Sequence, residues 1–202
     1  MKKLWVVDHW GYADPFRDTF EFVDSPEKCD VIMLTGGSDI LPSHYGEKEN
    51  KRTYTSPTRD KYELEAFNYG KQHGKGFLGI CRGAQLLTAL AGGKVIQHID
   101  NHTSTHSVVT VDGKVMLTSS LHHQMMYPWP IQNWKLLAWA DVPRSGRYLN
   151  GDDENIKLPE PKEPEVTFYP DIKALCIQGH PEMMSPDAPF VQWCNQQAKE
   201  LL

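Results

Sequence analysis

The feature of this sequence that most constrains its fold is the stretch GFLGICRGAQLLTAL at residues 76–90. It opens with an apolar run of strand length that stops at Cys81, and an apolar helical pattern follows at residues 84–90. Gly79 and Gly83 flank the cysteine at the spacing G-x-C-x-G. A strand that turns into a helix around small residues can hold one side chain up at the C-terminal edge of a sheet. The stretch therefore predicts a strand, a sharp turn that presents Cys81, and a helix.

Other short apolar runs predict further strands, and polar segments with helical spacing separate them. The first half of the chain predicts strands at residues 4–7, 30–37 and 76–80, with a helix at residues 59–73. Uninterrupted apolar strands that alternate with helices indicate a parallel sheet that is covered on both faces. The sequence therefore predicts an α/β fold with a mostly parallel sheet.

The second half of the chain is less regular. Asp112-Gly113 separates two strand-like runs, which predicts an added β-hairpin. Residues 150–164 are acidic and carry three prolines, so they indicate a surface loop and not a domain linker. Within and just after this segment, residues 160–165 indicate a solvated loop, with a lid as the alternative. Further strands are expected at residues 106–111, 114–118, 135–140, 165–169 and 174–178, and a closing helix at residues 188–202.

Composition and charge narrow the functional classes. A chain of 202 residues with 40% hydrophobic and 23% charged residues fits one globular domain over residues 1–202. The formal net charge is −5 and no block of lysine or arginine occurs, so no nucleic-acid partner is expected. The apolar run at residues 4–7 is too short for a signal peptide or a membrane span, and no other run approaches that length. No membrane association is therefore expected.

The cysteines indicate a reducing environment. The four of them are widely spaced and include no C-x-x-C pair. A disulfide framework is not expected in a chain of this size, which favours a cytoplasmic location. The cysteines are Cys29, Cys81, Cys176 and Cys194.

Cys81 itself has two interpretations. A free cysteine is usually a small buried hydrophobe. At the start of a helix, however, free N–H groups and the positive end of the dipole favour a thiolate and a developing oxyanion. A nucleophile also needs a base, and IQGHPEMM at residues 177–184 supplies a strand end followed by His180 and Glu182. Glu182 would orient the His180 ring, which would accept the thiol proton; the alternative is a surface histidine in a turn.

Other histidines compete with these assignments. His122 or His123 could replace His180 as the base, although the preferred interpretation is that one of the two lines the pocket. Three more histidines are spaced four residues apart, which on a helix would form a row of metal ligands. The residues between them are poor helix formers, so a polar loop without a metal site is expected. These three are His98, His102 and His106.

The stretches GICRGAQLL and QGHPE resemble the class I glutamine amidotransferases, and most closely their γ-glutamyl-γ-aminobutyrate hydrolase branch. LTGGSD, LPSHYGE followed by Arg59-Asp60, and SSLHHQ carry the same resemblance, which extends over residues 4–202. It implies a flavodoxin-like α/β fold with helices on both faces of the sheet, and a Cys81–His180–Glu182 triad that acts through a γ-glutamyl thioester. Arg82 is a departure, because many biosynthetic members carry an aromatic residue or leucine after the nucleophile.

The resemblance also implies roles for other residues. The backbone N–H groups of Gly37 and Arg82 would form the oxyanion hole. Gln85, Ser120 and His122 would bind the substrate, a small γ-glutamyl molecule. No cofactor and no metal are implied, since thiol chemistry requires neither.

Three functions fit these expectations. The first is hydrolysis of a γ-glutamyl amide, either a γ-glutamyl conjugate or glutamine, which releases glutamate and an amine or ammonia. The second is a glutaminase subunit that delivers ammonia to a separate synthase. The third is a non-catalytic regulatory module on the same fold, which an intact triad disfavours. The amine side of the substrate is left open.

Overall fold

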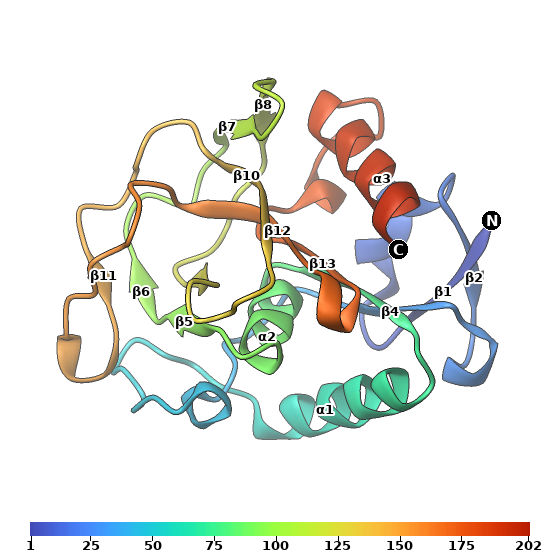
Figure 1. The fold of residues 1–202 in the computed structure, drawn as a ribbon, viewed down its shortest axis with the longest axis horizontal. Helices are drawn as coiled ribbons and strands as arrows, with labels where there is room; N and C mark the ends of the chain where they lie inside the picture. The colour runs from blue at the N-terminus through green and yellow to red at the C-terminus, as the bar shows by residue number, and fades with distance from the viewer.

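A nine-stranded sheet runs through the protein, with helices packed against it (Figure 1). The computed structural model describes residues 1–202. The strand order is β2-β1-β3-β4-β13-β12-β10-β7-β8. These strands are β1 (Lys2–Val6), β2 (Phe20–Val23), β3 (Val31–Leu34), β4 (Gly76–Ile80), β7 (His106–Thr110), β8 (Val115–Thr118), β10 (Lys135–Ala140), β12 (Pro164–Tyr169) and β13 (Ala174–Ile177).

The two halves of this sheet differ in strand direction. β2, β1, β3, β4 and β13 pair in parallel, whereas the pairings from β13 through β12, β10 and β7 to β8 are antiparallel. Every residue of β3, β4 and β13 is buried, which explains their uninterrupted apolar sequences. The predicted α/β fold is confirmed. The predicted hairpin is β7 and β8, at one edge of the sheet.

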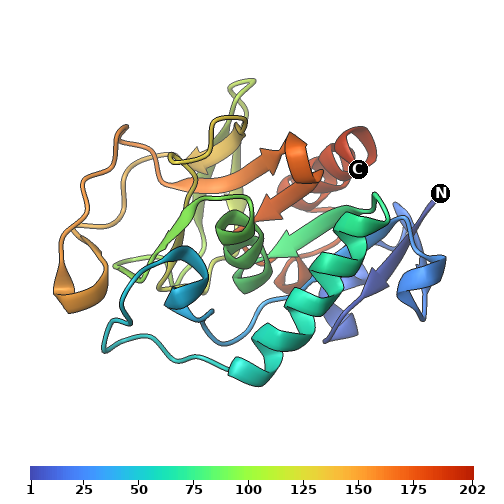
Figure 2. The same cartoon turned by 60° about the horizontal axis from the view of Figure 1, so that its bottom comes forward.

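Two faces of the sheet carry different helices, as Figures 1 and 2 show. α1 (Pro57–Gln72) and α2 (Arg82–Leu90) cover one face, and α3 (Pro189–Leu201) covers the other. In β3, Ile32 packs in the core with Phe67 of α1, whereas the next residue, Met33, packs in the core with Phe190 of α3. This alternation is what a strand buried on both faces requires. None of the helices combines the length and the apolar character needed to cross a membrane.

Short elements complete the fold. Two small antiparallel sheets, which the sequence patterns did not predict, pair β5 (Lys94–Ile96) with β9 (Met125–Tyr127) and β6 (His98–Ile99) with β11 (Tyr148–Leu149). Strands this short carry too few residues for a periodic pattern. The 3₁₀ helices are η1 (Trp10–Phe16), η2 (Pro26–Lys28), η3 (Pro42–Tyr45), η4 (Gly151–Asp153), η5 (Pro170–Ile172) and η6 (Pro181–Met183).

The acidic segment at residues 150–164 departs from the prediction at its end. β12 begins at Pro164, and Glu163 and Glu165 on either side are fully buried. The interpretation of residues 160–165 as a solvated loop is therefore confirmed for residues 160–162 and wrong for residues 163–165. Buried carboxylates require partners, and these two find histidines, which the next subsection describes.

Candidate active site

Cys81 lies on a strained turn between β4 and α2. Its backbone has φ 49° and ψ −107°, a positive φ that residues other than glycine rarely adopt. A Cβ on Gly79 would lie 2.7 Å from the backbone nitrogen of Ala84, and one on Gly83 would lie 2.1 Å from the carbonyl oxygen of Leu34. The G-x-C-x-G spacing therefore has a steric cause, because only glycine lets α2 pack this closely against β3 and β4.

His180 and Glu182 follow the neighbouring strand β13. β13 pairs in parallel with β4, so the turns after both strands meet at one edge of the sheet. The Cys81 N–H donates to the carbonyl oxygen of Ile177 at 2.8 Å, which links the two turns directly. Nδ1 of the His180 ring lies 2.6 Å from Oε1 of Glu182. The backbone N–H of His180 donates to the carbonyl oxygen of Ser119 at 2.9 Å. The imidazole is thus oriented from one side by a carboxylate.

The other ring nitrogen of His180 faces the cysteine. Its Nε2 atom is buried and makes no hydrogen bond of full geometry, so the contact with Cys81 is looser than the contact with Glu182. Burial lowers the pKa of His180, but its polar contacts with Cys81 and Glu182 outweigh this effect and raise the pKa to about 10.

A pocket of about 230 Å³ opens beside Cys81. Gly37 lies in its wall with φ 148°, and Gln85 and His122 also line it. Ser120 does not line the pocket; its hydroxyl is buried and donates to the carbonyl of His102 at 2.7 Å. The expectation that Ser120 binds the substrate directly therefore finds no support in the structure.

Sequence analysis missed Asp39 and Tyr54 as pocket residues. Asp39 is 7% exposed, and its Oδ2 accepts from the N–H of Tyr54 at 2.8 Å. His123 Nε2 lies 3.1 Å from both carboxylate oxygens of Asp39, so this histidine also carries a carboxylate partner at the pocket. His122 instead pairs its Nδ1 with the carbonyl of Gln124 at 2.8 Å, and burial lowers its pKa to about 3. The signal available for Asp39 was an aspartate two residues after the glycine pair that follows a strand.

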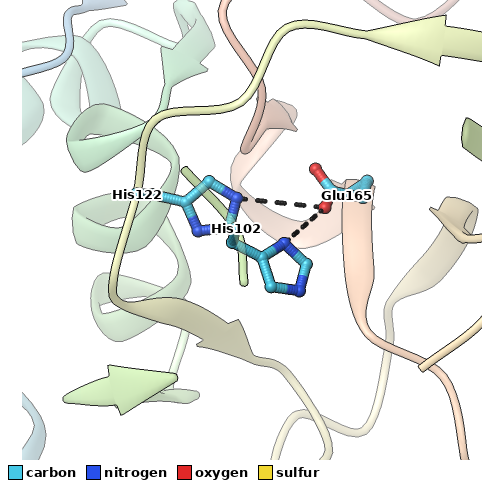
Figure 3. Close-up of side chains that lie close together, drawn as sticks. All are labelled: His102, His122 and Glu165. Carbon is cyan, nitrogen blue, oxygen red and sulfur yellow. Dashed lines mark ion pairs between the residues drawn. The ribbon is translucent and has the colours of Figure 1, made fainter. Parts of the chain in front are cut away.

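A histidine–glutamate cluster, which consists of His102, His106, His122, Glu163 and Glu165, is buried next to the pocket residue His122. Figure 3 shows three of its members, His102, His122 and Glu165. His102 lies between the two carboxylates, with Nε2 3.0 Å from Glu163 and Nδ1 3.3 Å from Glu165. His106 contributes a second contact to Glu165, at 2.9 Å from its Nε2. Burial lowers the pKa of His102, but its contacts with both glutamates outweigh burial and raise the pKa to about 9. The cluster explains how two glutamates can be buried in this part of the chain.

The three histidines at four-residue spacing do not form the alternative row of metal ligands. His98 is separate from the cluster and lies 3.4 Å from Asp100, whereas His102 and His106 contact the buried glutamates. His102, His122 and Glu165 do present ligand atoms within 4.8 Å of one another, a set that a metal ion could use. Because both ring nitrogens of His102 already face carboxylates, a metal ion would first have to displace a proton from this ring.

The strand order and the elbow match the class I glutamine amidotransferase fold. The chain belongs to the peptidase C26 family, whose model matches residues 15–135. It is 42% identical over 175 residues to the glutamine amidotransferase-like protein YvdE of Lactococcus lactis, a match that covers 76% of this chain and 66% of YvdE. A relative from Mycobacterium tuberculosis named as a glutamine amidotransferase is 38% identical over 70 residues, 34% of this chain and 23% of its own length. The chain thus spans less than two thirds of these relatives.

Solved structures show the same fold. A protein from Thermoplasma acidophilum that is named for GMP synthase has a TM-score of 0.64 at 15% identity, and the match covers 100% of this chain and 94% of its own. The glutaminase domain of CTPS from Trypanosoma brucei, with bound acivicin, has a TM-score of 0.60 at 12% identity and covers 98% and 93%. The predicted resemblance to class I glutamine amidotransferases is confirmed.

Proposed function

We propose that this protein hydrolyses a γ-glutamyl amide through a thioester on Cys81. The observation that carries the proposal is the juxtaposition of a cysteine in a strained elbow with the buried His180–Glu182 pair, beside one small pocket. A pocket of about 230 Å³ fits a small acyl group better than a peptide. The γ-glutamyl conjugates rank first among the substrates, following the resemblance to the γ-glutamyl-γ-aminobutyrate hydrolase branch.

The reaction is proposed to run in two half-reactions. His180 takes the thiol proton, and the Cys81 sulfur attacks the γ-carbonyl carbon. The backbone N–H groups of Gly37 and Arg82 stabilise the oxyanion, which collapses as the C–N bond breaks and His180 protonates the leaving amine. Water then attacks the thioester as His180 accepts its proton, and the C–S bond breaks to release glutamate while His180 returns that proton to the Cys81 sulfur. Glu182 orients the imidazole throughout, and no cofactor is needed.

The remaining assignments support substrate binding. Gln85 and His122 line the pocket, so both stay as proposed contacts to the glutamyl group. Ser120 contributes only indirectly, by holding the loop that precedes His122. Tyr54 and Leu121 are 73% and 56% exposed at the pocket rim, where the amine side of a substrate would emerge.

A second candidate function is a glutaminase subunit that feeds ammonia to a separate synthase. The likeness of the fold to a protein named for GMP synthase, and to a glutaminase domain of CTPS, favours this alternative. A non-catalytic module ranks third, because such a module would not need the His180–Glu182 pair beside the cysteine.

The decisive test is release of glutamate from γ-glutamyl amides of small amines and from glutamine, with no other protein present. Turnover of the amides supports the hydrolase. No release of glutamate until a synthase is added supports the second candidate. Cys81→Ala should abolish turnover, His180→Asn should nearly do so, and Glu182→Gln should retain residual activity. His123→Asn is the matched control, because His123 also carries a carboxylate partner at the pocket. If His123 proved essential and His180 dispensable, the proposed base would be wrong.

A further inference from the structure

The two proposed oxyanion donors lie on separate turns, so something must fix the distance between them. Gly37 follows β3, and Arg82 begins α2. Oxyanion donors must lie about 2.7–3.1 Å from the position of the charged oxygen to be effective. The consecutive residues Gly36 and Gly37 give the first turn little stiffness of its own.

Arg59 on α1 holds the first turn. Its Nη2 donates to the carbonyl oxygen and to the Oγ1 of Thr35, at 3.1 Å and 2.8 Å. Its Nη1 occupies the space beside Gly37, since a Cβ there would lie 1.9 Å from this nitrogen. The guanidinium therefore contacts the backbone of the turn where the proposed donor sits.

The side chain of Arg82 reaches the same helix. It is 1% exposed and forms ion pairs with Asp60 and Glu63 of α1. Glu63 also accepts from Nε of Arg59 at 3.0 Å, so one buried carboxylate joins the two arginines. Asp60 accepts in turn from the N–H of Leu41 at 2.9 Å, on the segment that follows the first turn.

We infer that Arg59, Glu63, Arg82 and Asp60 form an arginine–carboxylate network that positions the oxyanion hole. The inference rests on the proposed function, because it concerns the geometry of the proposed donors. Arg59 holds the Gly37 turn through its side chain. The backbone N–H of Arg82 is the second proposed donor. The network has two further neighbours, since Asp8 lies 3.5 Å from Nε of Arg59 and Nε2 of His44 lies 3.1 Å from Asp60. Arg59 is a positioning residue, since it acts through the backbone of Gly37.

The test compares two reactions of the same thiol. Hydrolysis of γ-glutamyl-p-nitroanilide needs the oxyanion hole, whereas alkylation of Cys81 by iodoacetamide displaces iodide and forms no oxyanion at a carbonyl. Arg59→Lys keeps the charge but loses the bidentate geometry. We expect kcat to fall about 10- to 100-fold with KM within about threefold of the wild type, because one lost donor costs about 100- to 1,000-fold. The alkylation rate should stay within about threefold.

Controls separate positioning from stability. Arg17→Lys changes an exposed arginine that pairs only with Asp14, and should leave both rates unchanged. Thr35→Val removes one hydrogen bond to Arg59 and serves if Arg59→Lys does not fold. It should lower kcat, and Thr35→Ser, which restores the hydroxyl, should recover it.

Three results would overturn the inference. An unchanged kcat in both Arg59→Lys and Thr35→Val shows that the network does not position the donors. A parallel fall of turnover and alkylation shows an effect on the thiol instead. If the wild-type protein is alkylated at Cys81 but hydrolyses no amide, the proposed function is refuted. This inference is then refuted as well, because it rests on that function.

Discussion

Gly83→Ala is the substitution whose effect the structure determines most directly. An alanine within a helix is normally more stable than glycine by about 1 kcal/mol. Gly83 lies in α2, so helix propensity alone predicts a gain. The new Cβ, however, would lie 2.1 Å from the carbonyl oxygen and 2.5 Å from the carbonyl carbon of Leu34. These are backbone atoms of the central strand β3, and no side-chain rotation can relieve the overlap.

The overlap should outweigh the helix gain. Overpacking a well-packed core costs about 1–3 kcal/mol, and a contact with backbone belongs at the upper end of that range or beyond it. The net loss should be at least about 2 kcal/mol in the free energy of unfolding. For a chain of this size, that loss lowers Tm by about 4–8 °C. Because α2 must move away from β3, the proposed donors Arg82 and Gly37 should also separate, and turnover should fall.

Thermal and denaturant unfolding measure the first effect, and kcat measures the second. Gly146→Ala is the matched control, since a Cβ there meets no atom within 4 Å and its φ is not in the left-handed region. Its free energy of unfolding should change by less than about 1 kcal/mol. If Gly83→Ala were as stable as the wild type, close packing of α2 against β3 would not be the reason for glycine in the elbow.

Three further predictions concern the thiols, the pocket and pH. Limiting iodoacetamide should label Cys81 first, because burial raises the pKa of the other three thiols. Peptide mapping that finds another cysteine labelled first would contradict this prediction. Asp39→Asn should raise KM for γ-glutamyl-p-nitroanilide about tenfold or more but leave KM for glutaryl-p-nitroanilide unchanged. Only the first substrate carries an α-ammonium group that the Asp39 carboxylate can bind. Equal changes in KM for both substrates would show that Asp39 does not recognise this group. The pKa of His102 is raised from 6.5 to about 9, so its contribution to stability is complete below pH 6.5 and is lost as pH rises through 9. His102→Gln should flatten the fall in unfolding free energy over this range, whereas the exposed His73→Gln should not.

The elements nearest Cys81 were predictable because their signals are local. The strand at residues 76–80 was placed correctly, since an uninterrupted apolar run between polar residues is a strong strand pattern. The helix that follows begins at Arg82 and not at residue 84, because an arginine and a glycine at a helix start carry no apolar periodicity. The paired turns that bring Cys81 and His180 together follow from parallel pairing, which the strand patterns also implied.

The buried charges could not be predicted from sequence. Glu163 and Glu165 lie among prolines and lysines, so composition alone indicates a solvated loop. Their partner His102 lies about 60 residues earlier in the chain, and only the folded sheet brings it between the two carboxylates. The pairing of Arg82 with Glu63 also forms only in the folded chain, because the two residues are separated by 19 positions and a complete strand. Long-range charge pairing leaves no periodic trace in a sequence.

Arg82 shows how such a pairing changes the interpretation of a motif. An unusual residue directly after the nucleophile is easily taken as a determinant of substrate choice. Its side chain, however, is 1% exposed, is not part of the pocket wall, and ends among the carboxylates of α1. Only its backbone N–H is available to a substrate, and every residue except proline offers that group. The identity of residue 82 therefore concerns how α1 is held, and substrate choice must depend on residues that reach the pocket, with Asp39 and Tyr54 as the first to examine.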